Sequence, residues 1–396
     1  MPTALKIDFM KDCKKVELGE ICEMFSGGTP DSENKDYYNG DIPFIRSAEI
    51  SGNKTLLYLS ESGYNNSSAK MVDYGDLLYA LYGANSGECA ISKQCGAINQ
   101  AILCIRSKNE SISYIYYILL NKKKRIISKY LQGGQGNLSA AIIKKIKINL
   151  PPIEEQEKIA EILSTQDKFI ELKQKLVDRK KQQKKWLMQN LLTGKIRLKD
   201  FEGEWKKVKL GNIADVKGGK RIPKGYQLQN ENNGFPYITV SDMENGTVNK
   251  STIKYVPIDI IDNIKRYKIY SDDIYISVAG TLGLIGTIPK ELNGANLTEN
   301  ADKICDYHCN KQYLISMLSS EIIQNQIKTS QTNNAQPKLA IEQIKNFVFN
   351  LPQLEEQTAI AEILSAQDKE IELLEKQLEQ EKLKKKALIQ FLLKEE

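Results

Sequence analysis

Two stretches of the chain, residues 150–192 and 351–393, repeat apolar side chains at alternating steps of four and three residues. This spacing predicts a helix with one apolar seam that packs against a partner helix, as in a coiled coil. About 40 residues at 1.5 Å per residue make each predicted helix about 60 Å long. The predicted seam consists of Ile159, Leu163, Ile170, Val177, Leu187 and Leu191 in the first stretch, and of Ile360, Leu364, Ile371, Leu374, Leu378, Leu388 and Leu392 in the second.

Polar residues interrupt the middle of both seams, among them Lys173 and Lys180 in the first stretch and Glu381 and Lys385 in the second. In a two-helix coiled coil such residues either fix the register or mark where another subunit joins. The simplest partner for each helix is the other stretch, packed antiparallel, because a separate domain lies between them in the chain. The alternative is an ordinary amphipathic helix on its own domain, although such helices usually span about 8–20 residues.

The two stretches are copies of each other. About 25 of roughly 43 positions are identical without a gap, at a constant offset of 201 residues, whereas solenoid repeats span about 20–50 residues. The preceding segments also share signals, since the strand-like run Asp273–Gly280 matches Asp76–Gly83. We therefore predict two similar domains, residues 1–150 and 201–350, and two long helices, residues 151–200 and 351–396.

The composition is that of a soluble globular protein, with 396 residues, 41% hydrophobic and 27% charged. The N-terminal residues lack the apolar core of a signal peptide, and no run reaches the roughly 18 apolar residues of a membrane span, so we expect a cytoplasmic protein. The seven cysteines are odd in number and scattered, which is typical of reduced thiols.

Charge is unevenly distributed around a net value of +6. Residues 151–200 carry 12 basic and 8 acidic side chains, whereas residues 351–396 carry 7 basic and 11 acidic ones. The positive excess outside the last helix suits a polyanionic partner, but alone it is weak support for nucleic-acid binding. The run Lys122–Arg125 is typical of a solvated helix face, although it could approach phosphate.

The usual signatures of catalysis are missing from the sequence. There is no phosphate-binding G-x-x-x-x-G-K-[ST] loop, and the glycines at Gly280, Gly283 and Gly286 have the wrong spacing for a dinucleotide fingerprint. The single histidine, His308, leaves little room for a catalytic triad. The cluster from Cys305 to Cys309 lacks a second ligand pair, so we predict no metal site. We expect a chain without catalytic activity or a cofactor of its own.

Three motifs stand out in the repeated stretches and directly after the first of them. The first, L-P-[PQ]-[IL]-E-E-Q-x-x-I-A-E-I-L-S-x-Q-D, occurs at Leu150–Asp167 and again at Leu351–Asp368. The others are L-L-T-G-K-I-R-L at Leu191–Leu198 and F-E-G-E-W-K-K-V-K-L-G at Phe201–Gly211. These motifs resemble those of the specificity subunits of type I restriction-modification enzymes. The resemblance covers nearly the whole chain, and the doubled helix motif is highly specific.

This resemblance implies an α+β fold in which two similar target-recognition domains are separated by two long antiparallel helices, the conserved helices of the family, which are coiled-coil-like and pseudo-twofold symmetric. Each domain would read one half of a bipartite site in double-stranded DNA, and the helices would act as a ruler for the spacer. The implied partners are two methyltransferase subunits, which bring S-adenosylmethionine and modify adenine, and restriction motor-nuclease subunits, which bring ATP and Mg²⁺.

Base edges are read by polar side chains on loops, and phosphates are held by lysine and arginine. On these grounds we predict DNA contacts in both domains. In the first domain they are Arg46, Ser47, Lys54, Tyr82, Asn85, Ser86, Gln135 and Asn137, and in the second Lys220, Arg221, Lys224, Thr239, Asp242, Thr281, Asn333, Gln336 and Lys338.

Two other functions remain open from the sequence. The chain could be an interaction scaffold, whose helices assemble partners while its domains bind protein. It could also be a nuclease with a cryptic active site in one domain, for which the sequence offers least support.

Overall fold

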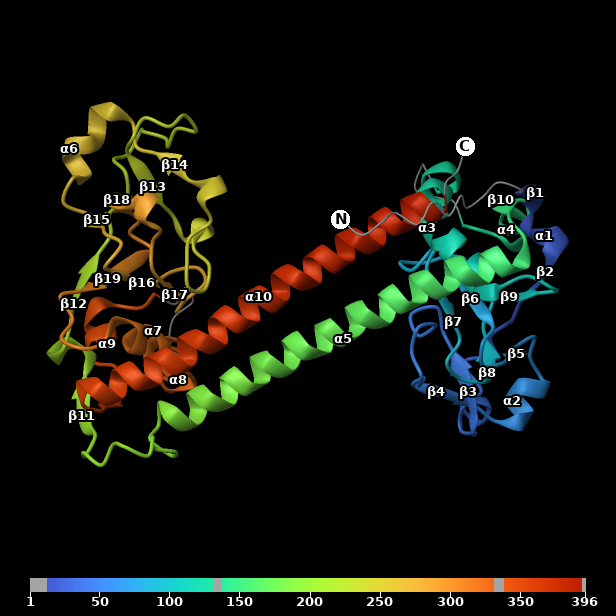
Figure 1. The fold of residues 1–396 in the computed structure, drawn as a ribbon, viewed down its shortest axis with the longest axis horizontal. Helices are drawn as coiled ribbons and strands as arrows, with labels where there is room; N and C mark the ends of the chain where they lie inside the picture. Colours follow the sequence, from blue (N-terminus) through green and yellow to red (C-terminus); the bar gives the residue numbers. More distant parts are fainter. Residues whose placement is uncertain (1–12, 132–136, 331–337, 394–396) are drawn as a thin grey trace. The chain divides into compact units, whose positions relative to one another are not determined.

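The computed structural model describes residues 13–131, 137–330 and 338–393, which form two compact units. The first unit comprises residues 1–174 and 376–396, and the second comprises residues 175–375. Two helices have 39 residues each, α5 (Ile153–Leu191) and α10 (Leu354–Leu392) (Figure 1). One part of each helix belongs to the first unit and the other part to the second. The predicted α+β fold with two similar domains and two long helices is confirmed.

The first unit contains two four-stranded sheets and a two-stranded sheet, with strand orders β2-β9-β6-β7, β4-β3-β8-β5 and β1-β10. Only the β3–β8 pair of these sheets is parallel. The strands are β1 (Lys14–Glu17), β2 (Cys22–Ser26), β3 (Ile42–Ile45), β4 (Leu57–Leu59), β5 (Lys70–Val72), β6 (Leu77–Ala80), β7 (Cys89–Ile91), β8 (Gly96–Ile98), β9 (Ile102–Ser107) and β10 (Lys147–Leu150). The helices are α1 (Leu18–Ile21), α2 (Glu61–Asn65), α3 (Ile112–Tyr130) and α4 (Ala140–Lys144), with a 3₁₀ turn, η1 (Lys35–Tyr38).

The second unit repeats this topology, with strand orders β12-β19-β16-β17, β14-β13-β18-β15 and β11-β20, and with β13–β18 parallel. Its strands are β11 (Lys206–Lys209), β12 (Asp215–Gly218), β13 (Pro236–Ile238), β14 (Lys254–Tyr255), β15 (Lys268–Ile269), β16 (Ile274–Ser277), β17 (Ile285–Gly286), β18 (Ala295–Leu297), β19 (Ala301–Cys305) and β20 (Val348–Leu351). Its helices are α6 (Ile261–Ile264), α7 (Lys311–Ser319), α8 (Glu321–Thr329) and α9 (Ile341–Lys345). Its 3₁₀ turns are η2 (Leu210–Asn212), η3 (Val240–Asp242), η4 (Lys250–Thr252), η5 (Ile258–Ile260) and η6 (Lys290–Leu292).

The glutamine of the repeated L-P-x-x-E-E-Q motif joins the start of each long helix to its own domain. Gln156 donates to the Pro151 carbonyl at 2.8 Å and accepts at 3.1 Å from the N–H of Ser111, the N-cap of α3. The equivalent Gln357 accepts at 2.8 Å from the N–H of Asn310, the N-cap of α7. Both glutamines are buried, and each satisfies backbone groups whose loss of a partner costs about 1–3 kcal/mol.

The predicted seam residues lie on the buried side of both long helices. Nine of them are less than 9% exposed, namely Ile159, Leu163, Val177, Leu191, Ile360, Leu364, Ile371, Leu378 and Leu392. Ile170, Leu187, Leu374 and Leu388 are partly buried. In the first unit Ile159 and Leu163 share a core cluster with Leu392, and in the second Leu191 shares one with Ile360. Within each unit the seam therefore joins both helices to the domain core.

Polar side chains in mid-seam pair across the helices within each unit. The pairs are Gln166–Glu381, Lys173–Gln377 and Asp167–Lys385 in the first unit, and Lys180–Glu370 and Lys184–Asp368 in the second. The α10 partner number falls from 385 to 377 between Asp167 and Lys173, and from 370 to 368 between Lys180 and Lys184, so the helices run antiparallel in both units, as predicted. Lysines on α5 meet acids on α10 in the second unit, which matches the opposite net charges of the two segments. Of the two predicted roles for these residues, the structure supports fixing the register.

Among the helices of the described ranges, none combines the length and apolar character that a membrane crossing requires.

Candidate nucleic-acid interface

The loop after β3 is braced by one carboxylate. This loop carries three of the predicted DNA contacts, Arg46, Ser47 and Lys54. The Glu49 carboxylate accepts hydrogen bonds from the Arg46 guanidinium at 3.0 and 3.2 Å. It also accepts from the Thr55 hydroxyl at 3.0 Å and from the Leu56 N–H at 3.1 Å. Burial acts to raise the pKa of Glu49, but these hydrogen bonds outweigh it and lower the pKa to about 2. Arg46 is thus held at the loop surface by a carboxylate that stays ionised.

In the second unit, a carboxylate likewise braces the loop after β13. Asp242 follows Thr239 by three residues, as Glu49 follows Arg46, and it accepts from the Thr239 N–H at 2.8 Å and hydroxyl at 2.6 Å. The Thr252 hydroxyl donates to its other oxygen at 2.6 Å. Asp242 was predicted to contact DNA, but it is only 3% exposed and its oxygens are engaged by the loop itself. We therefore assign Asp242 a bracing role beneath the loop.

Three predicted contact segments of the second unit meet residues 297–301, and the fourth, which carries Lys338, joins them through Val278. The connecting hydrogen bonds are Lys220 N–H to Leu297 O (2.8 Å), Thr298 N–H to Ile238 O (3.0 Å), Val278 N–H to Asn300 O (2.8 Å) and Leu339 N–H to Val278 O (2.9 Å). Lys220, Thr239, Thr281 and Lys338 each lie within three residues of one of these bonds. Segments separated by more than 100 residues in sequence are thus brought to one place.

The first unit gathers its predicted contacts in the same way. Ile45, next to Arg46, pairs with Ile98 in the parallel β3–β8 ladder. The Leu81 N–H donates to the Ala101 carbonyl at 2.8 Å, and the Leu138 N–H donates to the Leu81 carbonyl at 3.0 Å. Arg46, Tyr82 and Asn137 therefore adjoin connected strand ends.

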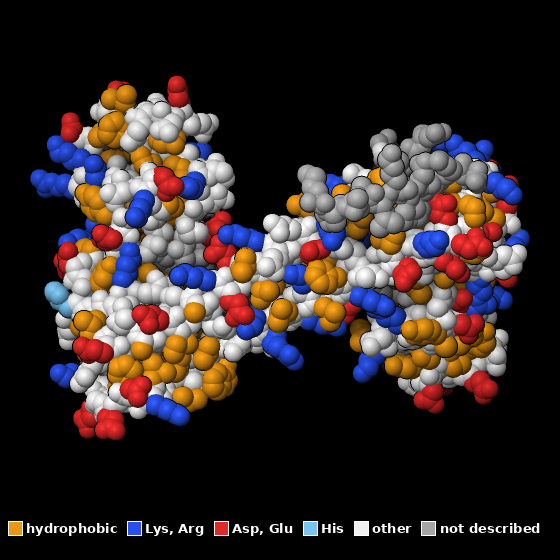
Figure 2. Space-filling model, viewed as in Figure 1, with side chains coloured by type: hydrophobic (Ala, Val, Ile, Leu, Met, Phe, Trp, Pro, Cys, Tyr) orange, Lys and Arg blue, Asp and Glu red, His pale blue; other side chains and the backbone are white. Residues whose placement is uncertain are grey.

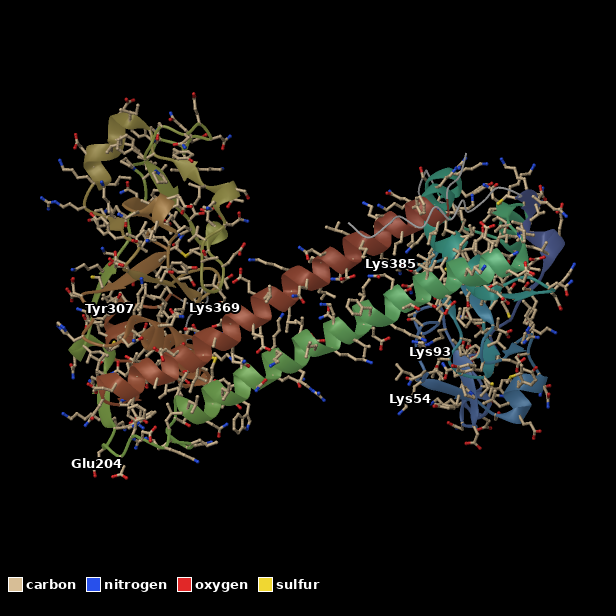
Figure 3. The ribbon with its side chains drawn as sticks, viewed as in Figure 1. Lys54, Lys93, Glu204, Tyr307, Lys369 and Lys385 are labelled. Atoms are coloured by element: carbon tan, nitrogen blue, oxygen red, sulfur yellow. The ribbon has the colours of Figure 1, made fainter. Side chains whose placement is uncertain are left out.

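The predicted contacts differ in their exposure. Lys54, Asn137, Lys220, Arg221, Lys224, Thr281 and Lys338 are exposed, and Arg46, Ser47, Tyr82, Asn85, Ser86 and Thr239 are half-buried. Lys54 lies at the periphery of the first domain (Figure 3). Gln135, Asn333 and Gln336 lie outside the described residues. The DNA contacts of the other predicted residues stay predictions.

Sequence reasoning missed Glu49 and the segment that joins the loops, including Gln100 and its counterpart Glu299. Gln100 accepts from the Thr29 hydroxyl at 2.6 Å, and Glu299 forms an ion pair with Arg221. The signal for Glu49 was available, because an acid stands four residues after the end of the matching strand in both domains.

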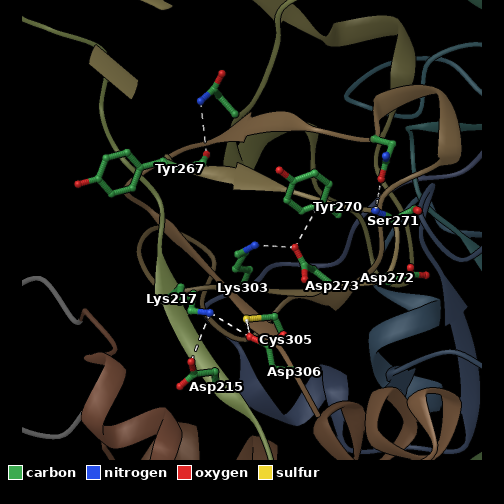
Figure 4. A network of polar contacts seen from close by, with 12 residues as sticks. Asp215, Lys217, Tyr267, Tyr270, Ser271, Asp272, Asp273, Lys303, Cys305 and Asp306 are labelled. Atoms are coloured by element: carbon green, nitrogen blue, oxygen red, sulfur yellow. Dashed lines mark hydrogen bonds and ion pairs between the residues drawn. The ribbon is translucent and has the colours of Figure 1, made fainter. Parts of the chain in front are cut away.

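The segment after β19, where we predicted no metal site, is held by ion pairs. Lys217 lies 3.3 Å from Asp215 and 3.0 Å from Asp306, and the Cys305 thiol donates to Asp306 at 3.3 Å (Figure 4). Burial, together with the hydrogen bond to Asp306, raises the pKa of the Cys305 thiol, which disfavours the thiolate that a metal requires. Within the described ranges, no group of three or more histidine, cysteine or acidic side chains could hold a metal ion.

The long helices also present apolar side chains to solvent, between lysines and acids (Figure 2). In the first unit these include Phe169 and Leu172 of α5 and Leu383 of α10, with exposed fractions of 44%, 64% and 66%. In the second unit they include Trp186 of α5 and Leu373 of α10, at 53% and 57%. Large apolar side chains that are exposed in series are typical of surfaces that bind another protein.

Comparison with known proteins gave consistent matches along the chain. The family model of the type I restriction modification DNA specificity domain matches residues 10–179 and again residues 202–382. The type I restriction enzyme MjaVIII specificity subunit of Methanocaldococcus jannaschii is 26% identical and aligns with 96% of this chain and 91% of its own length. The EcoBI specificity subunit of Escherichia coli is 22% identical, over 87% of this chain and 77% of its own.

Two solved structures share the fold. The type I restriction-modification S subunit from M. genitalium superposes with a TM-score of 0.61 at 15% identity and covers 99% of this chain and 98% of its own. A chain from a study of complex assembly and conformational transition of the type I restriction-modification system gives 0.60 at 16% identity, over 97% of both chains.

Proposed function

The chain belongs to the family of type I restriction-modification DNA specificity subunits, and from this premise we propose that its two domains read the two halves of a bipartite DNA site. The observation that carries this proposal is the pair of equivalent loop clusters, built on one topology but with different side chains. After matching strands the first domain presents Arg46 and the second Thr239. Equal scaffolds with unlike loops suit the recognition of two unlike sequences.

Partner docking is the second part of the proposal. Methyltransferase subunits would place helices against the exposed apolar side chains of α5 and α10, such as Phe169, Leu172 and Leu373. Those subunits would supply S-adenosylmethionine and the adenine chemistry, and motor-nuclease subunits would supply ATP hydrolysis with Mg²⁺. The chain itself would provide specificity without catalysis. That the helices set the length of the spacer stays a prediction from the resemblance.

Single substitutions in the two loop clusters should act on different halves of the site. Arg46→Ala should weaken binding of the assembled methyltransferase complex to its target duplex by about 1–3 kcal/mol and relax the preference in one half-site. Lys338→Ala should do the same for the other half-site if it reads a base. Binding to duplexes with one half-site randomised, measured by fluorescence anisotropy at fixed salt, separates the two effects.

Lys265→Ala is the control for charge, because it removes an exposed lysine on the second unit that belongs to neither loop cluster. Unchanged binding of the Arg46→Ala complex would remove that residue from the interface. The scaffold function would gain support if the complex bound duplex DNA without a steep loss of affinity at rising salt.

A further inference from the structure

In the first unit, α3 and the β1–β10 sheet enclose a groove of about 380 Å³. Its floor includes the buried side chains of Ile126 and Ile146. Six cationic side chains line it, from Lys15, Lys122, Arg125, Lys129, Lys145 and Lys147. Strand pairing sets this arrangement, because β1 and β10 place Lys15 opposite Asn149 and Lys147 opposite Glu17.

The cations are close enough to affect one another. Burial lowers the pKa of Lys122, and repulsion from Arg125 and Lys15 adds to this, so that the pKa falls to about 8. The Glu17 carboxylate lies 4.0 Å from Lys147 Nζ at the same sheet. Several positive charges around one hollow create a potential that an anion would relieve.

The second unit provides an internal comparison. Its equivalent groove lies between α8 and the end of α9, where Ile327, Asn346 and Phe347 stand 201 residues after Ile126, Lys145 and Ile146. The lining there consists of Asn325, Gln326, Thr329, Ser330, Gln343, Asn346 and Phe347, none of which carries a formal charge. One lysine stands beside it, because Lys209 of β11 donates to Asn346 at 2.9 Å. The fold therefore does not require cations in the lining of this groove.

The basic groove shares α3 with a predicted reading loop. Gly87, at φ +80°, closes the loop of residues 83–87 against the side of α3, where a Cβ atom would stand 3.0 Å from Ile127 Cδ1. Lys123, on that same side of α3, forms an ion pair with Glu88. Lys122 and Arg125 line the adjoining side of the helix. A DNA backbone that passes the loop thus has cations next to its path.

We propose that this groove binds phosphate groups of the backbone of double-stranded DNA and adds affinity to the first domain without reading sequence. The inference deepens the proposed function and rests on it for the nature of the polyanion. Lysine binds phosphate as a point charge, and arginine binds it through two parallel hydrogen bonds. Each such contact releases counterions from the DNA. The lining of the equivalent groove in the second unit carries no charged residue, so we expect this contact to be stronger in the first domain.

The test uses the full chain with Lys122→Gln and Lys129→Gln combined, and a random-sequence duplex of about 30 base pairs. The control combines Lys124→Gln and Lys144→Gln, two exposed lysines on α3 and α4 that do not line the groove but remove the same charge. We expect the groove variant to weaken duplex binding and to reduce the slope of log affinity against log salt by about 2 relative to the control, about 1 for each lysine.

Two further probes identify the ligand chemistry, inorganic tripolyphosphate and poly-L-glutamate. Loss of tripolyphosphate binding with unchanged duplex binding would overturn the backbone proposal in favour of a small phosphorylated ligand. Loss of poly-L-glutamate binding alone would overturn it in favour of an acidic protein segment. Equal effects in the control would show a general charge effect and would also overturn it. Because the duplex is random, these results do not depend on whether the domains read a bipartite site.

Folding of the groove variant can be checked by thermal unfolding. The groove variant and the control should unfold at temperatures close to that of the unmodified chain, so that a change in duplex binding reports the groove and not a loss of folding.

Discussion

Replacing Glu356 by alanine is expected to lower the free energy of unfolding of the second unit by about 3–5 kcal/mol. The Glu356 carboxylate is 2% exposed and accepts from Arg197 at 2.7 and 2.8 Å and from the Trp205 indole N–H at 2.9 Å. Alanine would leave the Arg197 guanidinium, whose side chain is 31% exposed, without its countercharge and would leave the Trp205 N–H without its acceptor. The effect should be large because the lost partner is charged and buried.

Tryptophan fluorescence during urea unfolding measures this effect directly. The two tryptophans, Trp186 and Trp205, both belong to the second unit, so the signal reports that unit. Glu355→Ala is the matched control, because Glu355 is the exposed neighbour on the same helix and should change stability by less than about 0.5 kcal/mol. Similar midpoints for both variants would show that the buried pair does not anchor the unit.

Replacing Asp302 by asparagine is expected to stabilise the second unit at neutral pH by up to about 3 kcal/mol, at 1.36 kcal/mol per pKa unit. Asp302 lies in β19 and is 5% exposed. Burial raises its pKa to about 6, an effect that the charge of Lys338 partly offsets. The equivalent position in the first unit is the buried Leu103, since Asp302 pairs with Ile276 as Leu103 pairs with Tyr79.

The sign of the pH dependence follows from that raised pKa. Between about pH 4 and pH 6 the folded chain keeps the Asp302 proton that the unfolded chain has released, so stability falls as pH rises through this window. The amide of the Asp302→Asn variant would not titrate, and the difference between variant and unmodified chain should grow from near zero below about pH 4 to its full value above about pH 6. Asp259→Asn, at an exposed position, is the control. A constant difference across this pH range would contradict the account.

The sequence alone supported the long helices and the duplication well, for physical reasons. The seam at Ile159 and Leu163 shows as periodic apolar spacing, and the repeat shows as identity at a fixed offset. The motif glutamines could be seen as repeated letters, but their hydrogen bonds to Ser111 and Asn310 depend on tertiary contacts.

The candidate interface was predicted less fully. The position of Arg46 and Lys338 in predicted loops suggested them as DNA contacts. For an acidic residue, however, the residue type does not show whether it lies at the surface or is buried beneath a loop that it braces. Asp242 was therefore placed at the surface, and its counterpart Glu49 was missed. The run Lys122–Arg125 divides in the structure, because Lys122 and Arg125 line the basic groove while Lys124 is exposed outside it. The side of α3 that faces the β1–β10 pair determines which of these residues line the groove. The sequence does not show this, because β1 and β10 are far apart along the chain.

The central claim is that this chain supplies the sequence specificity of a methyltransferase complex, one half-site for each domain. Single-molecule sequencing of DNA modified by the complex maps the methylated adenines, first with the unmodified chain and then with residues 205–350 replaced by the matching domain of another specificity subunit. We predict a bipartite motif in the first case, and in the second the same motif with only one half changed. Methylation at an unchanged motif, or a change in both halves, would contradict the claim.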